Sequence, residues 1–137
     1  MSDKMPAPGV YYIVNRVLSP TGEKLAMTFE GKGELAKAMP LTNSAAQRWI
    51  IGKFDAKTQS VSPADSPSLQ AGWGKGVIIL PAGNYVWTIR KEDDGYTIQD
   101  GGVTVYWGLD HAKEGESISI GAGTGGEKQR WVLESHA

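Results

Sequence analysis

The chain has 137 residues, of which 40% are hydrophobic and 21% are charged, and these proportions are typical of one soluble domain with a buried core. Its 14 basic residues nearly balance its 15 acidic residues, and no basic run exceeds two residues, so neither a nucleic-acid-binding surface nor an anionic-membrane-binding surface is indicated. The absence of cysteine excludes disulfides, thiolate metal ligands and cysteine nucleophiles.

The amino-terminal segment, residues 1–8, lacks the apolar stretch of a signal peptide, and no segment approaches the length that spans a membrane. The sequence therefore predicts a cytoplasmic protein. The 18 glycines and seven prolines are spread between short runs of aromatic and β-branched residues, which is typical of turns that join many strands.

Short strand-like runs follow one another along the whole chain. In the first third they are residues 9–15, 25–29, 35–41 and 47–54, with a tight turn at 30–34. In the second they are 59–61, 68–71, 77–80 and 85–90, with a turn at 72–76. In the last they are 95–98, 103–107, 117–120 and 129–133. No window shows convincing helical periodicity, so the helix content should be close to zero.

Three tryptophans mark an internal repeat. Gln47-Arg48-Trp49-Ile50 returns as Gln129-Arg130-Trp131-Val132, and a looser copy around Trp87 has Tyr85 in place of the glutamine. The intervals of 38 and 44 residues between these tryptophans favour three units that share one core, with each tryptophan buried at its centre.

These patterns predict an all-β fold of the β-trefoil type, with twelve strands in three four-stranded repeats and pseudo-threefold symmetry. The repeats are expected at about residues 9–56, 57–94 and 95–135 of a single domain that covers residues 1–137. A propeller or a sandwich is the alternative, but three blades are fewer than propellers use, and a sandwich gives no reason for threefold recurrence.

Catalytic and metal-binding patterns are sparse. The only histidines are His111, beside Asp110, and His136 near the end, and no Gly-X-Ser-X-Gly turn accompanies them. No spacing suggests a set of metal ligands, and the acidic run at residues 92–94 indicates a solvated turn. Residues 121–126 match a dinucleotide-binding glycine pattern, but a strand follows them, so they indicate a hairpin loop. The sequence predicts a protein that is not an enzyme, has no catalytic residues, metal or cofactor, and binds through its loops.

The motifs Gly9-X-Tyr11-X-Ile13-X-Asn15, Gln47-X-Trp49 and Gln129-X-Trp131, with Tyr96-Thr97-Ile98, Tyr106-Trp107-X-Leu109 and Gly115-X-X-Ile118, carry a resemblance over most of the chain. They resemble the mushroom β-trefoil serine protease inhibitors of the cospin and cnispin type. The Gln-X-Trp element is also similar to that of the ricin B-like trefoil lectins, which are more distant.

The resemblance implies a cytoplasmic fungal protein that inhibits a trypsin-like serine protease through one exposed loop, without a cofactor. The loops that it implicates are residues 30–34 and 121–128. The candidate contacts are Lys32, between Gly31 and Gly33, and Lys128, next to Glu127, because trypsin recognises a basic side chain before the scissile bond.

The alternative function is that of a carbohydrate-binding lectin of the ricin B-like trefoil type, with glycans as partners. Against it, the third-strand runs at 35–41, 77–80 and 117–120 contain no aromatic residue, whereas ricin-like sugar sites use one there. In its favour, Trp73 lies between two glycines, and Tyr106 and Trp107 are consecutive, so one of that pair should face outward from a strand. Trp73, Tyr106 and Trp107 are therefore the candidate sugar-binding residues.

Overall fold

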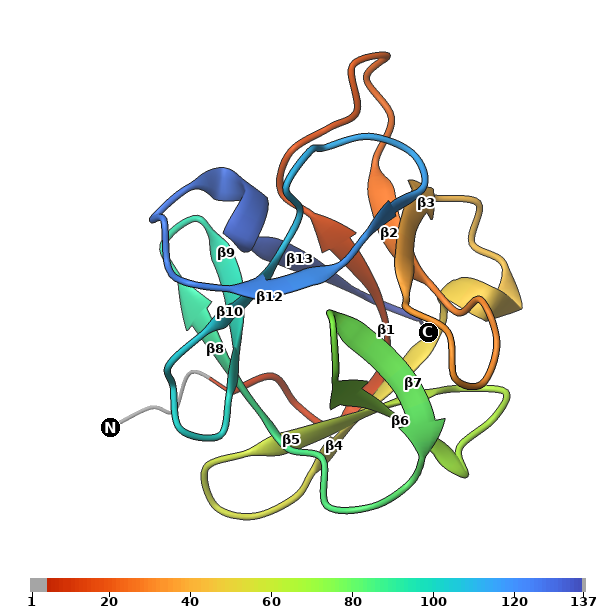
Figure 1. Cartoon of the computed structure of the whole chain (residues 1–137), viewed down its shortest axis with the longest axis vertical. Coiled ribbons are helices and arrows are strands. Elements are labelled where there is room, and N and C mark those ends of the chain that lie inside the picture. Colours follow the sequence, from red (N-terminus) through yellow and green to blue (C-terminus); the bar gives the residue numbers. More distant parts are fainter. Residues whose placement is uncertain (1–4, 137) are drawn as a thin grey trace.

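The computed structural model describes residues 5–136 and consists of short antiparallel strands with two three-residue 3-10 helices (Figure 1). Repeat one contains β1 (Gly9–Asn15), β2 (Leu25–Thr28), β3 (Lys37–Pro40), the 3-10 helix η1 (Ala45–Gln47) and β4 (Trp49–Lys53). Repeat two contains β5 (Gln59–Pro63), β6 (Leu69–Trp73), β7 (Val77–Pro81) and β8 (Trp87–Glu92). Repeat three contains β9 (Gly95–Asp100), β10 (Tyr106–Gly108), β11 (Glu116–Ser117), β12 (Ser119–Gly121), η2 (Glu127–Gln129) and β13 (Trp131–Ser135).

Six of these strands close a barrel. Strand β1 pairs with β4, β4 with β5, β5 with β8, β8 with β9, β9 with β13, and β13 with β1. The hairpins β2–β3, β6–β7 and β10–β12 supply the remaining strands, one hairpin per repeat. Strands β11 and β12 are separated only by Ile118, and together they replace the single strand that the sequence predicts at residues 117–120. The fold is a β-trefoil of three four-stranded repeats, as predicted.

A ring of three backbone hydrogen bonds joins the three hairpins. The Ala36 N–H donates to the Val77 carbonyl (2.8 Å), the Val77 N–H to the Ile118 carbonyl (3.0 Å), and the Ile118 N–H to the Ala36 carbonyl (3.0 Å). Successive members are 41 residues apart in the sequence. All three side chains are fully buried, so the pseudo-threefold axis passes through a dry, hydrogen-bonded centre.

The repeat tryptophans occupy equivalent buried positions, which confirms the predicted register. Trp49 and Trp131 have no exposed surface and Trp87 is 2% exposed. Each indole N–H donates to the carbonyl of a residue in the second strand of its own repeat. The acceptors are Met27, Ala71 and Trp107, at 2.9, 2.9 and 3.1 Å, respectively.

Some element boundaries differ from the sequence prediction. Gln47 and Gln129 lie in 3-10 helices and not at the starts of strands, because their side chains bond to the loops that precede them. The strand expected at residues 103–107 begins only at Tyr106. Val103 has a φ of 58°, which is incompatible with an extended strand.

Candidate functional site

A glutamine fixes the loop before the last strand of repeat one. The Gln47 side-chain carbonyl accepts hydrogen bonds from the Thr42 N–H (2.8 Å) and hydroxyl (3.3 Å). Its amide group donates to the Pro40 carbonyl (2.9 Å) and to the Thr28 hydroxyl (3.2 Å). Gln47 is 2% exposed, so these bonds are formed in a site that is nearly dry.

Repeat three repeats this arrangement at the same sequence offsets. The Gln129 carbonyl accepts from the Thr124 N–H (2.8 Å) and hydroxyl (3.2 Å), and its amide donates to the Ala122 carbonyl (2.8 Å). Each 3-10 helix is also bonded to the residue that follows the second strand of its repeat. The Phe29 N–H, after β2, donates to the Ala46 carbonyl, and the Leu109 N–H, after β10, donates to the Lys128 carbonyl. As a result Leu109 is only 4% exposed, and Phe29 is half-buried with its ring edge-on to Trp49.

Repeat two lacks both the glutamine-bonded loop and the 3-10 helix that cover this position in repeats one and three. Only residues 82–86 separate Pro81 from Trp87, whereas residues 41–48 separate the equivalent Pro40 from Trp49, and no 3-10 helix forms among residues 82–86. Tyr85 stands at the glutamine position. Trp73, two residues beyond the indole acceptor Ala71, is the counterpart of Phe29 and Leu109. Its side chain is 51% exposed, so the position that is covered in the other repeats is open here.

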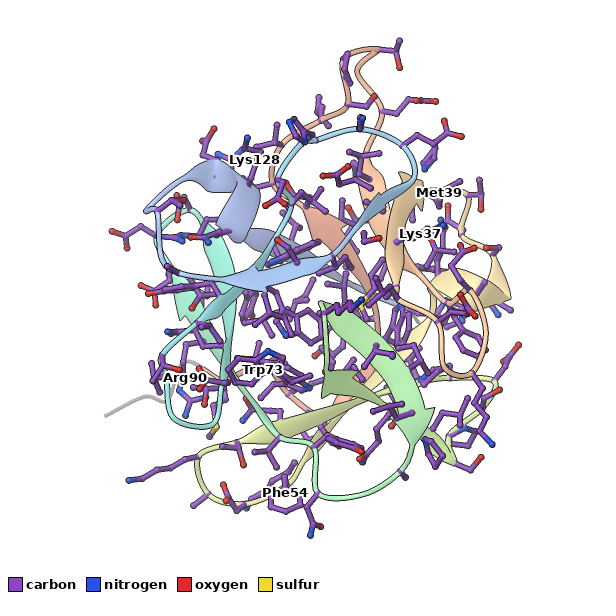
Figure 2. All side chains as sticks on the ribbon, in the orientation of Figure 1. Lys37, Met39, Phe54, Trp73, Arg90 and Lys128 are labelled. Atoms are coloured by element: carbon purple, nitrogen blue, oxygen red, sulfur yellow. The ribbon has the colours of Figure 1, made fainter. Side chains whose placement is uncertain are left out.

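A shallow pocket of about 250 Å³ lies at this opening. In Figure 2, Trp73 lies between the β6–β7 hairpin and the loop that joins β9 to β10. Asn84 is exposed and Tyr85 and Val86 are half-buried, whereas Trp87 belongs to the core. The pocket is lined by Trp73, Asn84, Tyr85, Val86, Trp87, Asp100 and Gly101.

Glycines set the position of the Tyr85 ring. A Cβ atom at Gly72 would lie 3.2 Å from Tyr85 Cδ1, and one at Gly83 would lie 3.4 Å from Tyr85 Cε2. The ring therefore packs closely over backbone that carries no side chain. The Gly83 N–H donates to the side-chain carbonyl of Gln70 (3.0 Å), which fixes the loop that carries Asn84. The pocket walls are therefore held in place without a bound partner.

Asp100 shapes the opposite wall. Its Oδ1 accepts from the N–H groups of Thr104 (2.6 Å) and Val105 (3.0 Å), and its Oδ2 accepts from the Thr104 hydroxyl (2.7 Å). Burial acts to raise the pKa of Asp100, but the hydrogen bonds from Val105 and Thr104 outweigh it and hold that pKa below its ordinary value. The carboxylate is thus ionised and fully engaged in holding the loop.

This arrangement suits the binding of a neutral, polar molecule with an apolar face. The exposed indole of Trp73 offers an apolar surface, and the same pocket is lined by Asn84 and Tyr85, whose side chains carry hydrogen-bond donors and acceptors. Among residues 5–136 no group of three His, Asp or Glu side chains could hold a metal ion. In the same part of the chain no helix has the length and apolar character needed to cross a membrane.

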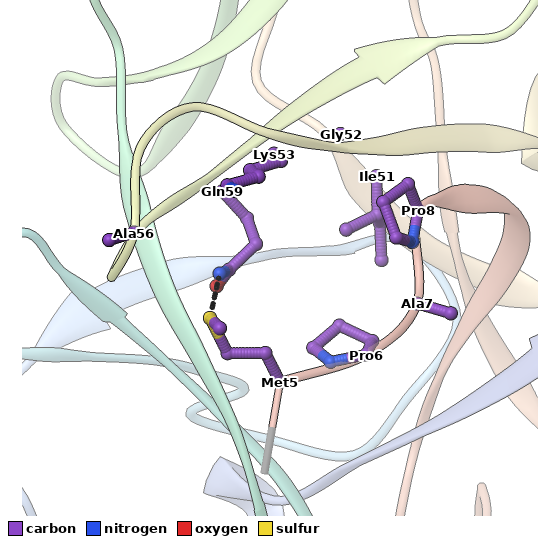
Figure 3. A pocket seen from close by; sticks show the side chains of 9 residues that line it. All are labelled: Met5, Pro6, Ala7, Pro8, Ile51, Gly52, Lys53, Ala56 and Gln59. Carbon is purple, nitrogen blue, oxygen red and sulfur yellow. Dashed lines mark hydrogen bonds between the residues drawn. The ribbon is translucent and has the colours of Figure 1, made fainter. Parts of the chain in front are cut away.

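A second pocket, of about 570 Å³, lies between residues 5–8 and strands β4 and β5 (Figure 3). Its buried polar group is Gln59, whose carbonyl accepts from the Ile89 N–H (2.8 Å) and whose amide contacts the Met5 sulfur (2.9 Å). Gln59 therefore links the amino-terminal segment to the barrel. This pocket is larger than the Trp73 pocket, but no aromatic side chain lines it.

The sequence matches the model of one protein family over residues 9–131, and that family is described as CCL2 lectin-like. The chain belongs to the CCL2-like family. The prediction of a serine protease inhibitor is therefore wrong, because the family that the chain matches is described as lectin-like. The motifs that suggested it most strongly lie in repeat three, and their residues Trp107, Leu109 and Ile118 are buried in the core, so they specify the fold and not what the loops bind.

The two loops expected to bind a protease have other conformations in this CCL2-like chain. Gly31 and Gly33, on either side of the exposed Lys32, have φ values of 125° and 82°, which are not those of an extended substrate. Lys128 lies with Glu127 in the 3-10 helix η2, and its Nζ donates to the Asp110 carbonyl (3.0 Å).

The candidate sugar-binding residues are separated by the fold. Trp73 lines the pocket described above, whereas Tyr106 and Trp107 belong to repeat three. Trp107 has no exposed surface and its ring packs edge-on to Trp87, so it cannot offer a face to a ligand. Tyr106 is half-buried beside Gly123. Sequence reasoning missed Asn84, Tyr85 and Asp100, although the loss of the Gln-X-Trp signature at Tyr85 marked the divergent repeat.

Similar solved structures share the trefoil fold with this CCL2-like chain at low sequence identity. A mosquitocidal holotoxin has a TM-score of 0.85 and 15% identity; the match covers 97% of this chain but only 18% of the holotoxin. The Rhizoctonia solani agglutinin has a TM-score of 0.77 and 13% identity. The Macrolepiota procera ricin B-like lectin in complex with lactose has a TM-score of 0.72 and 15% identity. Both matches cover 98% of this chain and 100% of the other protein's chain. No curated protein matches the sequence at a significant level.

Proposed function

We propose that this protein is a lectin, a carbohydrate-binding protein without catalytic activity, and that the Trp73 pocket is its sugar-binding site. The observation that carries the proposal is the broken symmetry of repeat two. Trp73 is 51% exposed, whereas its counterpart Leu109 is 4% exposed beneath a 3-10 helix. A large apolar side chain that is left uncovered at one of three equivalent positions indicates a binding surface.

The pocket chemistry supports a sugar as the ligand. A sugar ring has an apolar face of C–H groups and a rim of hydroxyls, so it needs a flat apolar surface with polar groups beside it. Trp73 supplies the surface, and Asn84 and Tyr85 supply hydrogen-bonding groups at its edge. The absence of aromatic residues from the third strands does not weaken the proposal, because Trp73 ends the second strand of its repeat.

The comparisons favour the same ligand class. The family is described as lectin-like, one similar structure is an agglutinin, and another is a lectin in complex with lactose. Because all of these structures are less than 25% identical to this chain, they establish the fold alone, and the choice of a carbohydrate rests on the family and the pocket.

The test is retention of the protein on an array of immobilised oligosaccharides that includes lactose, followed by calorimetric titration with the oligosaccharide that is retained best. Trp73→Ala should weaken binding by at least about tenfold, which corresponds to about 1.4 kcal/mol. Phe54→Ala is the matched control, because Phe54 is also an exposed aromatic (46%) but lies away from Trp73 (Figure 2). Both variants should keep the far-ultraviolet circular dichroism of the wild type.

Two results would contradict the proposal. If no oligosaccharide is retained, the lectin proposal is wrong. If Trp73→Ala binds as tightly as Phe54→Ala, the sugar-binding site lies elsewhere on the trefoil.

A further inference from the structure

The loop between β9 and β10 contains an unusual backbone conformation. Among residues 5–136, only Asn43 and Val103 have a positive φ without being glycine, at 62° and 58°. Asparagine adopts this left-handed region readily, but a β-branched residue in it is a genuine outlier. Gly101 and Gly102 immediately precede Val103, yet neither of them has a positive φ. The strained position thus falls on the valine and not on an adjacent glycine.

Asp100 holds this conformation. Its backbone carbonyl accepts from the Val103 N–H (3.0 Å), and its carboxylate accepts from both the N–H and the hydroxyl of Thr104 and from the Val105 N–H. Four donors from three consecutive residues therefore converge on one aspartate. Because Asp100 is 9% exposed, water competes weakly for these bonds, and they tie residues 103–105 to the end of β9.

The strain does not improve the packing of the core. Val103 is 53% exposed and is one of five exposed large hydrophobic residues among residues 5–136. Strain that is retained without a packing benefit is typical of functional sites. The loop also adjoins the Trp73 pocket, because Asp100, the last residue of β9, and Gly101, the first residue of the loop, both line it. A Cβ at Gly101 would lie 3.1 Å from Val86 Cγ2, so the loop is packed against the pocket wall.

We propose that Val103 is a ligand-contacting, specificity-determining residue of the sugar site, and that Asp100 is the positioning residue that presents it. This inference rests on the proposed function. The side chain would contact an apolar part of the glycan, such as a methyl-bearing substituent, on a sugar residue beyond the one that covers Trp73. Because the loop is already ordered, contact with Val103 adds affinity without the entropic cost of fixing a loop.

Two substitutions separate contact from folding. Val103→Asn keeps a side chain of similar size but removes its apolar surface, and asparagine tolerates the left-handed conformation. Val103→Gly removes the side chain altogether and relieves the strain. Both variants should be at least as stable as the wild type, with a Tm up to roughly 4 °C higher. Both should nevertheless bind the best-retained array oligosaccharide about five- to tenfold more weakly. In the wild type, the Val103 methyl resonances should shift during titration with this oligosaccharide.

The combination of unchanged or higher stability with weaker binding is the expected result. Wild-type affinity in both Val103 variants, together with weakened binding in Trp73→Ala, would overturn the inference and leave the lectin proposal standing. Wild-type affinity in Trp73→Ala would instead refute the proposed site, and the role of Val103 with it. A lower Tm in both variants would show that the valine stabilises the loop, and would overturn the argument from strain.

Discussion

Replacing Gln47 with alanine tests whether glutamine side chains close two of the three repeats. Two of its hydrogen bonds, to the Thr42 N–H (2.8 Å) and the Pro40 carbonyl (2.9 Å), satisfy backbone groups. The other two involve hydroxyls, which can turn toward other partners. Leaving a buried backbone group without a partner costs about 1–3 kcal/mol, but Thr42 is exposed and Pro40 is half-buried, so water can replace part of the lost bonding. Gln47→Ala should therefore lower the free energy of unfolding by about 1–3 kcal/mol in total.

Urea denaturation followed by far-ultraviolet circular dichroism measures this loss, with an unchanged m-value if the unfolded state is unaffected. Amide hydrogen exchange locates it, because the Thr42 amide should exchange at least about tenfold faster in the variant. The Thr124 amide, which Gln129 holds in the same way, should be unchanged and serves as an internal control. A free energy of unfolding within about 0.5 kcal/mol of the wild-type value would show that the glutamine does not hold the loop. The difference between repeats one and three, which a glutamine closes, and the open repeat two would then have no energetic basis.

Two further predictions concern the packing between the three hairpins and the role of Asp100 in the wall of the Trp73 pocket. Gly76→Ala should destabilise the protein by about 1–3 kcal/mol, because its Cβ would lie 2.6 Å from the Ile118 carbonyl oxygen. Gly121→Ala is the control and should be nearly neutral, because its Cβ would have no atom within 4 Å. Equal melting temperatures for the two variants would contradict this prediction. The lowered pKa of Asp100 means that its stabilisation is complete above its unfolded-state pKa of about 3.9 and is lost as the pH falls through the lower folded-state value. The difference in Tm between the wild type and Asp100→Asn should therefore shrink as the pH falls below about 3.9, and a difference that stays constant down to the lowest pH would be inconsistent with an ionised Asp100.

The sequence was sufficient for the fold because large aromatic residues mark the repeat. Trp49, Trp87 and Trp131 are bulky, each is followed by a β-branched residue, and two of them share the Gln-Arg-Trp sequence, so their threefold recurrence can be recognised directly. The ring of three backbone hydrogen bonds that joins the hairpins could not be recognised from the sequence. Its members are an alanine, a valine and an isoleucine, and the bonds join main-chain atoms, which carry no residue-type signature.

The site was only partly accessible to sequence reasoning. Trp73 could be selected because it stands between two glycines, but the reason for its exposure is a shortened loop and a missing 3-10 helix. Asp100 carries no recognisable signal, because its role depends on contacts with Thr104 and Val105, which lie in a turn where the sequence predicts a strand. The inhibitor function was wrong because it relied on motifs that specify the trefoil core, and core motifs do not determine what the loops bind.

The distribution of tryptophans gives the protein a built-in optical reporter. Four of the five indoles are at most 2% exposed, and only Trp73 reaches solvent, so a water-soluble quencher such as iodide can collide only with the ring that is proposed to contact sugar. The quenchable fraction of the native emission therefore belongs to one residue. A ligand that covers this ring would shield it from iodide while the emission of the core stays unchanged, so occupancy of the pocket can be followed on the unlabelled, unmodified protein.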